Sequence, residues 1–241
     1  MVLENILVTG AFGRLGSELT KFIKKDYELV FTPSREEFSI DSMESIEKFC
    51  ENKKIDIILN LAAYTDVPMS SSLRGSVQSI LSNAIGAANL TMYSIKNNIK
   101  LIHVSTDAVF DGTKGGYNPS DKICPITNYG RTKASSELVV MCHPNSKIIR
   151  TSFISDEFPY TYALEDQYTS RDYLSKMLPL IYEEVLRFEP STVVHVGTER
   201  KTMLELAVQT NDNIEVKKVS DLNFKVPLDN SFGSTKRGKY V

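Results

Sequence analysis

The chain has 241 residues, and its 28 Lys and Arg against 30 Asp and Glu give a formal net charge of −2 at pH 7. This near balance gives no general attraction to nucleic acid or to an anionic membrane, so we expect neither as a partner. No apolar run approaches the roughly 20 residues of a membrane-spanning helix, and the N-terminus enters an apolar segment without a signal-peptide pattern, so we expect a cytoplasmic protein.

Residues 5–9 form a short apolar run that leads into three glycines, each separated from the next by two residues, in GAFGRLG. A strand, a glycine turn and a helix place backbone N–H groups and the positive helix end where a pyrophosphate can bind. Gly10 would permit the tight turn, Gly13 would let the phosphates approach, and Gly16 would let a helix over 17–25 pack on the sheet. An ordinary strand-helix turn has the same glycines, but the alternation that follows favours dinucleotide binding.

The segment after the second apolar run, residues 28–32, bears on the choice of cofactor. An NAD site usually offers a carboxylate to the ribose 2′-hydroxyl at this point. Here Ser34 and Arg35 follow, and a guanidinium beside a hydroxyl suits a 2′-phosphate. We therefore predict NADPH as the cofactor and keep NADH open, because Glu36 and Glu37 come next.

Apolar runs alternate with helical patterns along the chain, which predicts an α/β fold with a doubly wound parallel sheet of the Rossmann type. The expected strands are residues 6–8, 29–31, 55–61, 100–104, 147–149 and 192–197, and the expected helices 16–25, 42–52, 73–97, 128–141, 172–186 and 202–209. Thr202 with Glu205 forms a capping box at the start of the last helix. We divide the chain into an NAD(P)-binding domain, 1–153, and a smaller substrate-binding region, 154–241, interleaved with it.

Tyr129 and Lys133 lie four residues apart in a helical pattern, so both side chains point to one face. A phenol ionises near pH 10, and lowering this by about three units requires about 4 kcal/mol. An ammonium at about 4 Å supplies about that much at an effective dielectric constant of 20. We therefore expect Lys133 to lower the pKa of Tyr129. Thr106 ends the run 100–104 and could hydrogen-bond the carbonyl that Tyr129 protonates.

The cysteines and histidines show neither disulfide nor metal-site spacing, and we predict no metal site. The six residues are Cys50, Cys124, Cys142, His103, His143 and His195. An odd number of scattered thiols is typical of a reducing compartment. We interpret Cys124 and Cys142 as small buried hydrophobic residues, and His103 and His195, in apparent strands, as hydrogen-bonded core histidines.

These motifs together resemble the dTDP-4-dehydrorhamnose reductases, a branch of the extended short-chain dehydrogenase/reductases. The match covers residues 3–153 densely and runs through GAFGRLGSEL, IILNLAAYTDV, Asn83 with Gly86, STDAVFDG, Tyr117 and Asp121 before PITNYGRTKASSE, and IIRTSF. The resemblance implies that Thr106, Tyr129 and Lys133 are catalytic, with Asp107 orienting them. It also implies that Tyr129 and Lys133 contact the cofactor together with Gly10, Phe12, Gly13, Arg14, Leu15, Gly16, Ala62, Ala63 and Tyr64. The segment after residues 28–32 adds Ser34 and Arg35 to these cofactor contacts.

The segment DQYTSRDY, residues 166–173, is similar to the substrate loop of that family, with Ser170 and Arg171 in place of Pro and Thr. Arg171 could grip a substrate diphosphate bidentately, or it could be a surface charge near a helix start. With Thr106 and Val109 it completes the expected substrate contacts. Two departures concern the same region: the segment 154–164 is short, and Val226-Pro227 stands where the family has Arg-Pro.

The resemblance implies NAD(P)H-dependent reduction of the C4 ketone of a nucleotide-linked 4-keto-6-deoxyhexose, of the dTDP- or UDP-4-dehydrorhamnose type or with a 2-acetamido group. One alternative is a bifunctional 3,5-epimerase/4-reductase, although residues 106–109 lack the cysteine such enzymes commonly carry. Another is a non-catalytic NADP-binding regulatory subunit, like that of methionine adenosyltransferase. The apolar stripe of the helix 73–97 could serve a homodimer, but core packing explains it equally well.

Overall fold

The computed structural model describes residues 4–66, 69–234 and 236–240. Its centre is a seven-stranded sheet in the order β13-β10-β5-β4-β3-β1-β2, in which all neighbouring strands are parallel except the antiparallel edge strand β13. The predicted parallel α/β sheet is confirmed. The strands are β1 (Ile6–Thr9), β2 (Val30–Phe31), β3 (Ile57–Asn60), β4 (Lys100–Ser105), β5 (Ser146–Thr151), β10 (Thr192–Val196) and β13 (Arg237–Lys239).

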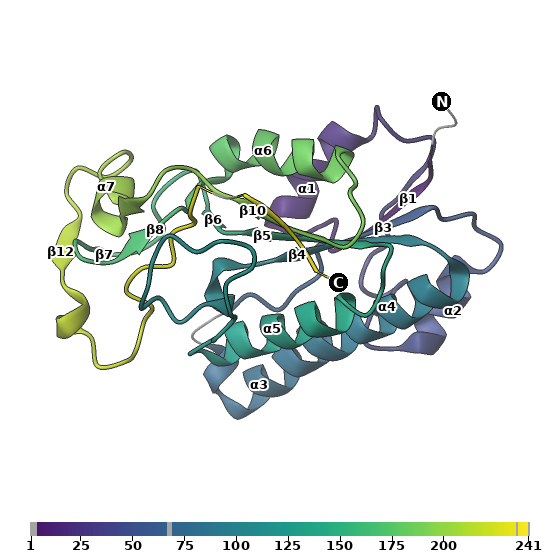
Figure 1. Ribbon diagram of the computed structural model, residues 1–241, viewed down its shortest axis with the longest axis horizontal. Coiled ribbons are helices and arrows are strands. Elements are labelled where there is room, and N and C mark those ends of the chain that lie inside the picture. The colour runs from purple at the N-terminus through teal and green to yellow at the C-terminus, as the bar shows by residue number, and fades with distance from the viewer. Residues whose placement is uncertain (1–3, 67–68, 235, 241) are drawn as a thin grey trace.

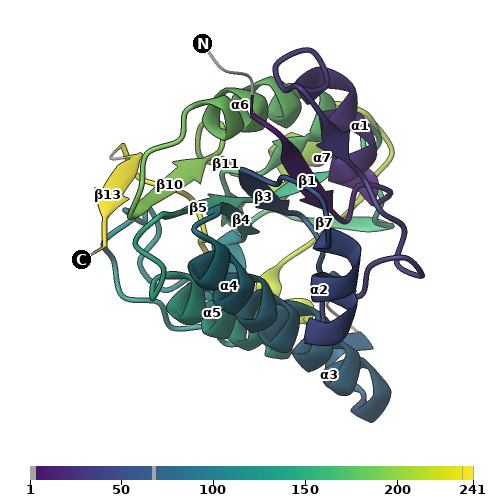
Figure 2. The same cartoon turned by 90° about the vertical axis from the view of Figure 1, so that its right-hand side faces the viewer.

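Helices cover both faces of the sheet, as a doubly wound fold requires. In Figures 1 and 2 α1 and α6 lie above the sheet, and α2, α4 and α5 lie below it. Each face has its own apolar core because side chains alternate along a strand: Ile6 and Val8 face α1 and α6, whereas Leu7 faces the opposite layer. The helices are α1 (Arg14–Ile23), α2 (Met43–Cys50), α4 (Gly86–Asn97), α5 (Asn128–Val140) and α6 (Leu174–Leu186).

The helix predicted over 73–97 is interrupted by a wider turn. It consists of α3 (Leu73–Ser79), a π-helical segment (Ile80–Ile85) and α4. Apolar periodicity does not distinguish a π segment from an α-helix, so this turn was not predicted. Such segments are frequent at functional sites, and this one contains the buried Asn83.

The segments of the chain between β5 and α6 and after β10 form a small lobe at the carboxyl end of the sheet, at the left of Figure 1. It has a separate apolar cluster that includes Leu164, Tyr173 and Leu206. The capping box of Thr202 and Glu205 is confirmed. The polar tail then returns to the main sheet as β13, which the sequence did not predict. The elements of the lobe are β6 (Phe153–Ile154), β7 (Tyr162–Leu164), β8 (Tyr168–Thr169), β9 (Asp172–Tyr173), β11 (Lys201–Thr202), α7 (Met203–Ala207) and β12 (Glu215–Lys217).

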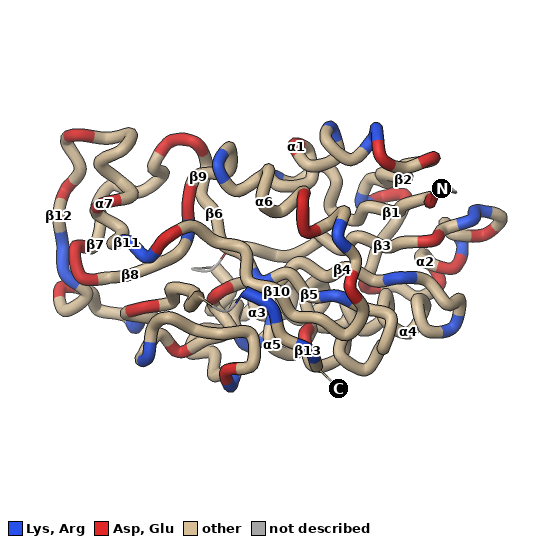
Figure 3. Tube along the Cα trace, turned by 45° about the horizontal axis from the view of Figure 1, so that its top comes forward, with Lys and Arg blue, Asp and Glu red and all other residues tan. Residues whose placement is uncertain are grey.

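Charged residues of both signs are interspersed along the trace (Figure 3). Within the described part of the chain no helix is both long and apolar enough to cross a membrane. The strand order reverses between β1 and β3. β2 lies on one side of β1, whereas β3 and then β4 lie on its other side. Ligands of doubly wound proteins bind at the carboxyl ends of the strands beside such a reversal.

Candidate active site

In the glycine turn after β1, the backbone lies very close to the loop after β3 and to the start of α1. Gly10 has a φ of +67°, and a Cβ on it would lie 2.7 Å from the backbone nitrogen of Ala62. A Cβ on Gly16 would lie 2.2 Å from the carbonyl oxygen of Gly10, so α1 packs against the turn only with glycine there. Gly13 is exposed and precedes α1, whose start has no side-chain cap and no acidic residue in its first turn. The N-terminus of α1 therefore presents N–H groups suited to an anion.

The other residues expected around this turn differ in where they point. Phe12 is 73% exposed, and Arg14 is also exposed, so both side chains flank the turn. Leu15 is buried in the core between α1 and the sheet, so only its backbone is available to a ligand.

Ser34 and Arg35 lie just beyond β2. The carboxylate of nearby Glu37 is hydrogen-bonded to Ser34. Ser34 donates its N–H to Glu37 Oε2 at 2.8 Å, and Ser34 Oγ accepts from the Glu37 N–H at 3.3 Å. The hydrogen bond from the Ser34 backbone lowers the pKa of Glu37 below its usual value. Arg35 is exposed and donates to Gln78 Oε1 at 3.4 Å. A guanidinium therefore stands at this edge, as the NADPH prediction requires.

The loop after β3 is held by Asn83 of the π segment. Asn83 Oδ1 accepts from the backbone N–H of Tyr64 at 2.8 Å, and Nδ2 donates to the Tyr64 carbonyl at 3.1 Å and to Thr132 Oγ1 at 3.0 Å. Asn83 thus joins the segment containing Ala62 and Ala63 to α5. Sequence reasoning noted Asn83 only as part of the family match and missed this role, although an Asn within an apolar helical stripe was a usable signal.

Thr106 and Asp107 follow β4 directly and are 5% and 3% exposed. Thr106 caps the short 3-10 turn Asp107–Val109 by accepting from the Ala108 N–H at 3.2 Å, and its hydroxyl donates to Asp107 Oδ1 at 3.0 Å. Val109 is fully buried beside Phe110, so its side chain belongs to the core rather than to an open surface.

Tyr129 lies in the first turn of α5, which Thr127 caps through the Gly130 N–H. Burial, and then the negative charge of Asp107, raise the pKa of Tyr129 to about 12, while a hydrogen bond with Thr106 and the charge of Arg171 act in the opposite direction. Tyr129 and Thr106 therefore meet at the end of β4, as predicted. The expected lowering of the phenol pKa by Lys133 is wrong for this arrangement.

The reason is the position of Lys133. It is 2% exposed, and its Nζ donates to the Val104 carbonyl at 2.8 Å and lies 3.2 Å from His103 Nε2. Burial lowers the pKa of Lys133 to about 8, against a smaller opposing effect of Glu137. Tyr129 and Lys133 share the first turns of α5, but the Lys133 side chain is hydrogen-bonded to β4 on the face of the sheet that α5 covers.

Arg171 reaches the same place from the small lobe. Its Nε donates to Ser152 Oγ at 2.8 Å, and its Nη2 lies 3.9 Å from Asp107 Oδ2. Its side chain is 27% exposed, so it is not a freely solvated surface charge. The structure thus places Arg171 beside Thr106, Asp107 and Tyr129.

Two further expectations concern isolated residues. Cys50 is buried, but Cys124 and Cys142 are exposed, and the interpretation of these two as buried hydrophobic residues is wrong. Cys124 lies in the loop before α5 and Cys142 just after that helix, where neither is covered. His103 and His195 are 1% and 2% exposed and hydrogen-bonded, as predicted.

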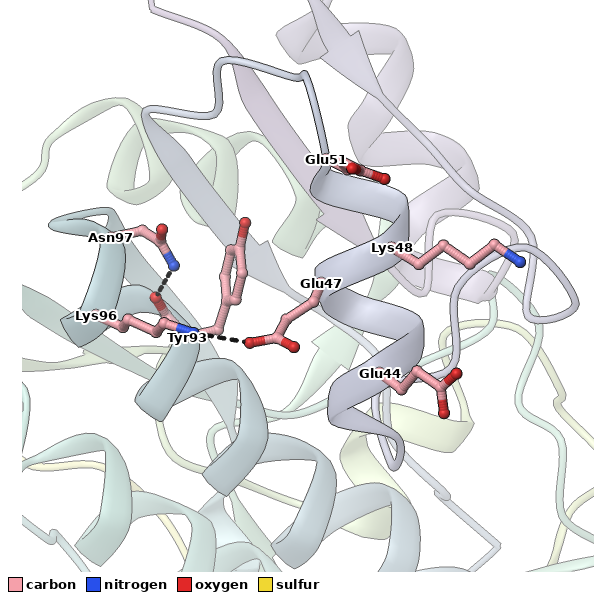
Figure 4. A pocket seen from close by; sticks show the side chains of 7 residues that line it. All are labelled: Glu44, Glu47, Lys48, Glu51, Tyr93, Lys96 and Asn97. Carbon is pink, nitrogen blue, oxygen red and sulfur yellow. Dashed lines mark hydrogen bonds and ion pairs between the residues drawn. The ribbon is translucent and has the colours of Figure 1, made fainter.

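Two surface hollows lie away from these residues. One, of about 620 Å³, lies between α2 and α4 and is lined by the charged side chains shown in Figure 4, among them Glu44, Glu47 and Lys96. The other, of about 330 Å³, lies between the end of α5 and the C-terminal segment and includes Cys142 and Tyr240. Neither contains a residue of the candidate site, which we locate instead by the convergence of buried polar groups at the carboxyl ends of β1, β3 and β4.

A doubly wound sheet with a glycine turn after its first strand and a Tyr-x-x-x-Lys helix beside its fourth defines a Rossmann-fold protein of the short-chain dehydrogenase/reductase type. The family model described as RmlD substrate binding domain matches residues 4–184. The chain belongs to this family.

Named relatives agree with this assignment. The chain is 36% identical over 160 residues to a dTDP-4-dehydrorhamnose reductase of Aggregatibacter actinomycetemcomitans, a match that covers 65% of this chain and 53% of that protein. The chain thus spans about half the length of the curated relatives it matches.

Solved structures are similar over nearly the whole chain. A dTDP-4-dehydrorhamnose reductase of Bacillus anthracis, in complex with NADP, superposes with a TM-score of 0.84 at 23% identity, covering 96% of this chain and 90% of that one. A hypothetical dTDP-4-dehydrorhamnose reductase of Sulfolobus tokodaii superposes with a TM-score of 0.82 at 27% identity, covering 95% and 92%.

Proposed function

We propose that the protein reduces the C4 ketone of a nucleotide-linked 4-keto-6-deoxyhexose, of the dTDP- or UDP-4-dehydrorhamnose type, with NADPH as the reductant. The observation that carries this proposal is the meeting of Thr106 and Tyr129 at the carboxyl end of β4, which only β3 separates from the strand β1 and its glycine turn. The relatives named dTDP-4-dehydrorhamnose reductase support the same substrate class.

The residues around the turn fit a dinucleotide. Only glycine fits at position 16, Gly13 leaves the start of α1 accessible, and Arg35 offers a guanidinium for a 2′-phosphate. We assign the pyrophosphate to residues 10–16, the nicotinamide side to the loop 62–64, and the ribose next to it to Tyr129 and Lys133. NADPH bound in this way would supply a hydride to the substrate carbonyl.

The side chains at the end of β4 would supply the proton. A pKa near 12 keeps Tyr129 protonated at neutral pH, so its phenol can donate to the carbonyl oxygen as negative charge develops there. Thr106 would hydrogen-bond the same oxygen and hold it at donor distance. Arg171 would add positive charge at this end of the substrate. We therefore propose that Arg171 acts near the reacting carbon and not at the diphosphate.

A spectrophotometric assay tests the proposal. NADPH oxidation is followed with enzymatically prepared dTDP- and UDP-4-keto-6-deoxy sugars, with NADH as the alternative reductant. Tyr129→Phe should abolish turnover, while NADPH binding, measured by fluorescence, should persist through the glycine turn, Arg35 and Lys133. Turnover by Tyr129→Phe at the wild-type rate would refute the assignment of the proton donor.

The same assay distinguishes the alternative functions. Solvent deuterium at C3 or C5 of the product would indicate an additional epimerase activity. NADPH binding without oxidation across the whole panel of keto sugars, together with tight binding of another protein, would indicate a regulatory subunit.

We also propose a cytoplasmic protein that forms a homodimer, with residues 154–241 as the substrate-binding region. The free thiols of Cys50, Cys124 and Cys142 support a reducing compartment. Exposed apolar side chains on α4 and α5, namely Met92, Ile95 and Leu138, support a dimer surface. Sedimentation at several concentrations tests it.

A further inference from the structure

Three buried polar side chains form a row across the face of the sheet that α5 covers. Thr9, Asn60 and His103 occupy paired positions on the neighbouring strands β1, β3 and β4, since Thr9 is in register with Asn60 and Asn60 with His103. Each is at most 2% exposed. Central parallel strands normally carry apolar side chains, and polar groups there are costly unless each one is hydrogen-bonded.

The hydrogen bonds of the row have a direction. Thr9 Oγ1 accepts from the Ala62 N–H at 3.2 Å and donates its own hydrogen to Asn60 Oδ1 at 2.7 Å. If the Asn60 amide were reversed, its nitrogen would face Thr9 and the Thr9 O–H would lose its acceptor. The amide nitrogen therefore faces His103, and Asn60 Nδ2 donates to His103 Nδ1 across 3.0 Å.

This direction determines where the His103 proton lies. Burial, followed by the charge of Lys133, lowers the pKa of His103 well below its usual value, so the imidazole is neutral. Because Nδ1 accepts, the single ring proton is on Nε2. Ser136 Oγ donates to the Lys133 carbonyl at 2.6 Å and so accepts from the Nε2–H at 2.9 Å. Lys133 Nζ, 3.2 Å from Nε2, therefore faces an N–H group and not a lone pair.

Other charged groups surround Lys133 without changing this contact. Glu137 lies one turn further along α5, but it is held in a buried ion pair with Arg150 of β5 at 2.8 Å. Tyr129, one turn earlier, is directed to Thr106, Asp107 and the charge of Arg171.

Lys133 Nζ has one clear acceptor within the described residues, the Val104 carbonyl at 2.8 Å. A buried ammonium with one acceptor and an opposing N–H group is poorly stabilised.

We propose that Thr9 and Asn60 are positioning residues that select the Nε2–H tautomer of His103, and that His103 thereby offers no acceptor lone pair to the amine of Lys133. The row begins at the Ala62 N–H beside the glycine turn and ends at α5. One chain of hydrogen bonds therefore connects the cofactor side of the site to its proton-handling side. Burial already lowers the pKa of Lys133, and the missing acceptor acts in the same direction, so Lys133 releases its proton more readily than an exposed lysine does. This inference rests on the proposed function only in treating Lys133 as part of a catalytic site.

The tautomer can be measured without substrate. In protein carrying 15N-labelled histidine, we expect His103 to show an unprotonated Nδ1 and a protonated Nε2 between pH 6 and 9, with His103→Gln used to assign its signals. A protonated Nδ1 in the wild-type protein would overturn the proposal, whether or not the protein proves to be a reductase.

Asn60→Asp provides the decisive variant. A carboxylate accepts from Thr9 as the amide does, but it also accepts on the His103 side, so the ring proton should move to Nδ1 and Nε2 should become an acceptor for Lys133. The alkaline limb of the pH–rate profile should then move up by one unit or more. Thr9→Ser keeps the hydroxyl and should preserve both the tautomer and the profile.

Thr9→Val removes the hydroxyl at similar volume and should give a mixture of the two tautomers in a folded protein. An unchanged tautomer and pH profile in Asn60→Asp would contradict the proposal. If instead no keto sugar is reduced while the tautomer behaves as expected, the proposed function fails and the positioning row stands.

Discussion

Lys133→Met tests how far burial opposes the charge of Lys133. Lowering the lysine pKa from 10.5 to about 8 destabilises the folded protein by about 3 kcal/mol at pH 7, because the unfolded chain holds the proton more tightly. Methionine fills a similar volume without this charge, but it removes the hydrogen bond to Val104 and leaves that carbonyl without its donor, at a cost of about 2 kcal/mol. We expect the variant to be about 1 kcal/mol more stable than the wild type at pH 7.

The sign of this difference should reverse with pH. Between pH 8 and pH 10.5 the unfolded wild-type chain binds more protons at this position than the folded protein does, so the wild type gains stability there and the variant does not. Above pH 10.5 only the lost hydrogen bond remains, and the variant should be about 2 kcal/mol less stable.

Urea unfolding at a series of pH values measures this difference. Lys21→Met, at an exposed lysine of α1 paired with Glu18, is the matched control and should show no such reversal. A constant difference between Lys133→Met and the wild type from pH 7 to pH 10.5 would refute the reasoning.

Three further variants probe the site and its support. Gly16→Ala places a Cβ 2.2 Å from a backbone oxygen, and we expect about 1–3 kcal/mol of destabilisation and weaker NADPH binding, measured by thermal unfolding and fluorescence titration. Glu137→Gln leaves Arg150 buried without its carboxylate partner and should cost about 3–5 kcal/mol in urea unfolding. Arg171→Thr removes a charge that lowers the pKa of Tyr129, so kcat should fall about tenfold with little change in KM; a raised KM at unchanged kcat would indicate diphosphate binding instead.

Local patterns predicted the parts of the fold that depend on neighbouring residues. A Cβ on Gly16 would collide with the Gly10 carbonyl of the same turn, and Gly10 has a positive φ, so these two glycines are informative without any tertiary knowledge. The placement of Tyr129 and Lys133 on one helix follows directly from their spacing. The π segment around Asn83 and the antiparallel strand β13 depend on contacts with distant residues, and the sequence alone did not reveal them.

The same limit explains the wrong prediction for Lys133. Spacing along α5 shows that Lys133 and Tyr129 are near one another, but it does not show the Val104 carbonyl or the imidazole of His103 beneath the helix. These acquire their positions only when β4 joins the sheet. His103 was correctly predicted to be a hydrogen-bonded core residue, but its partners on β3 and α5 could not be identified before the strand order was known.

The position of α5 depends on polar contacts with the sheet from two rows of side chains. Thr9, Asn60 and His103 form one row, which ends at Lys133 and Ser136. Arg150 and His195, paired in register on β5 and β10, form the second, which ends at Glu137. Apolar packing alone would let a helix shift along its axis at small cost, whereas a buried hydrogen-bonded group loses its partner when displaced. The two rows therefore fix α5 in both translation and rotation, and Tyr129, in its first turn, is held at the end of β4 by contacts on the helix's other turns.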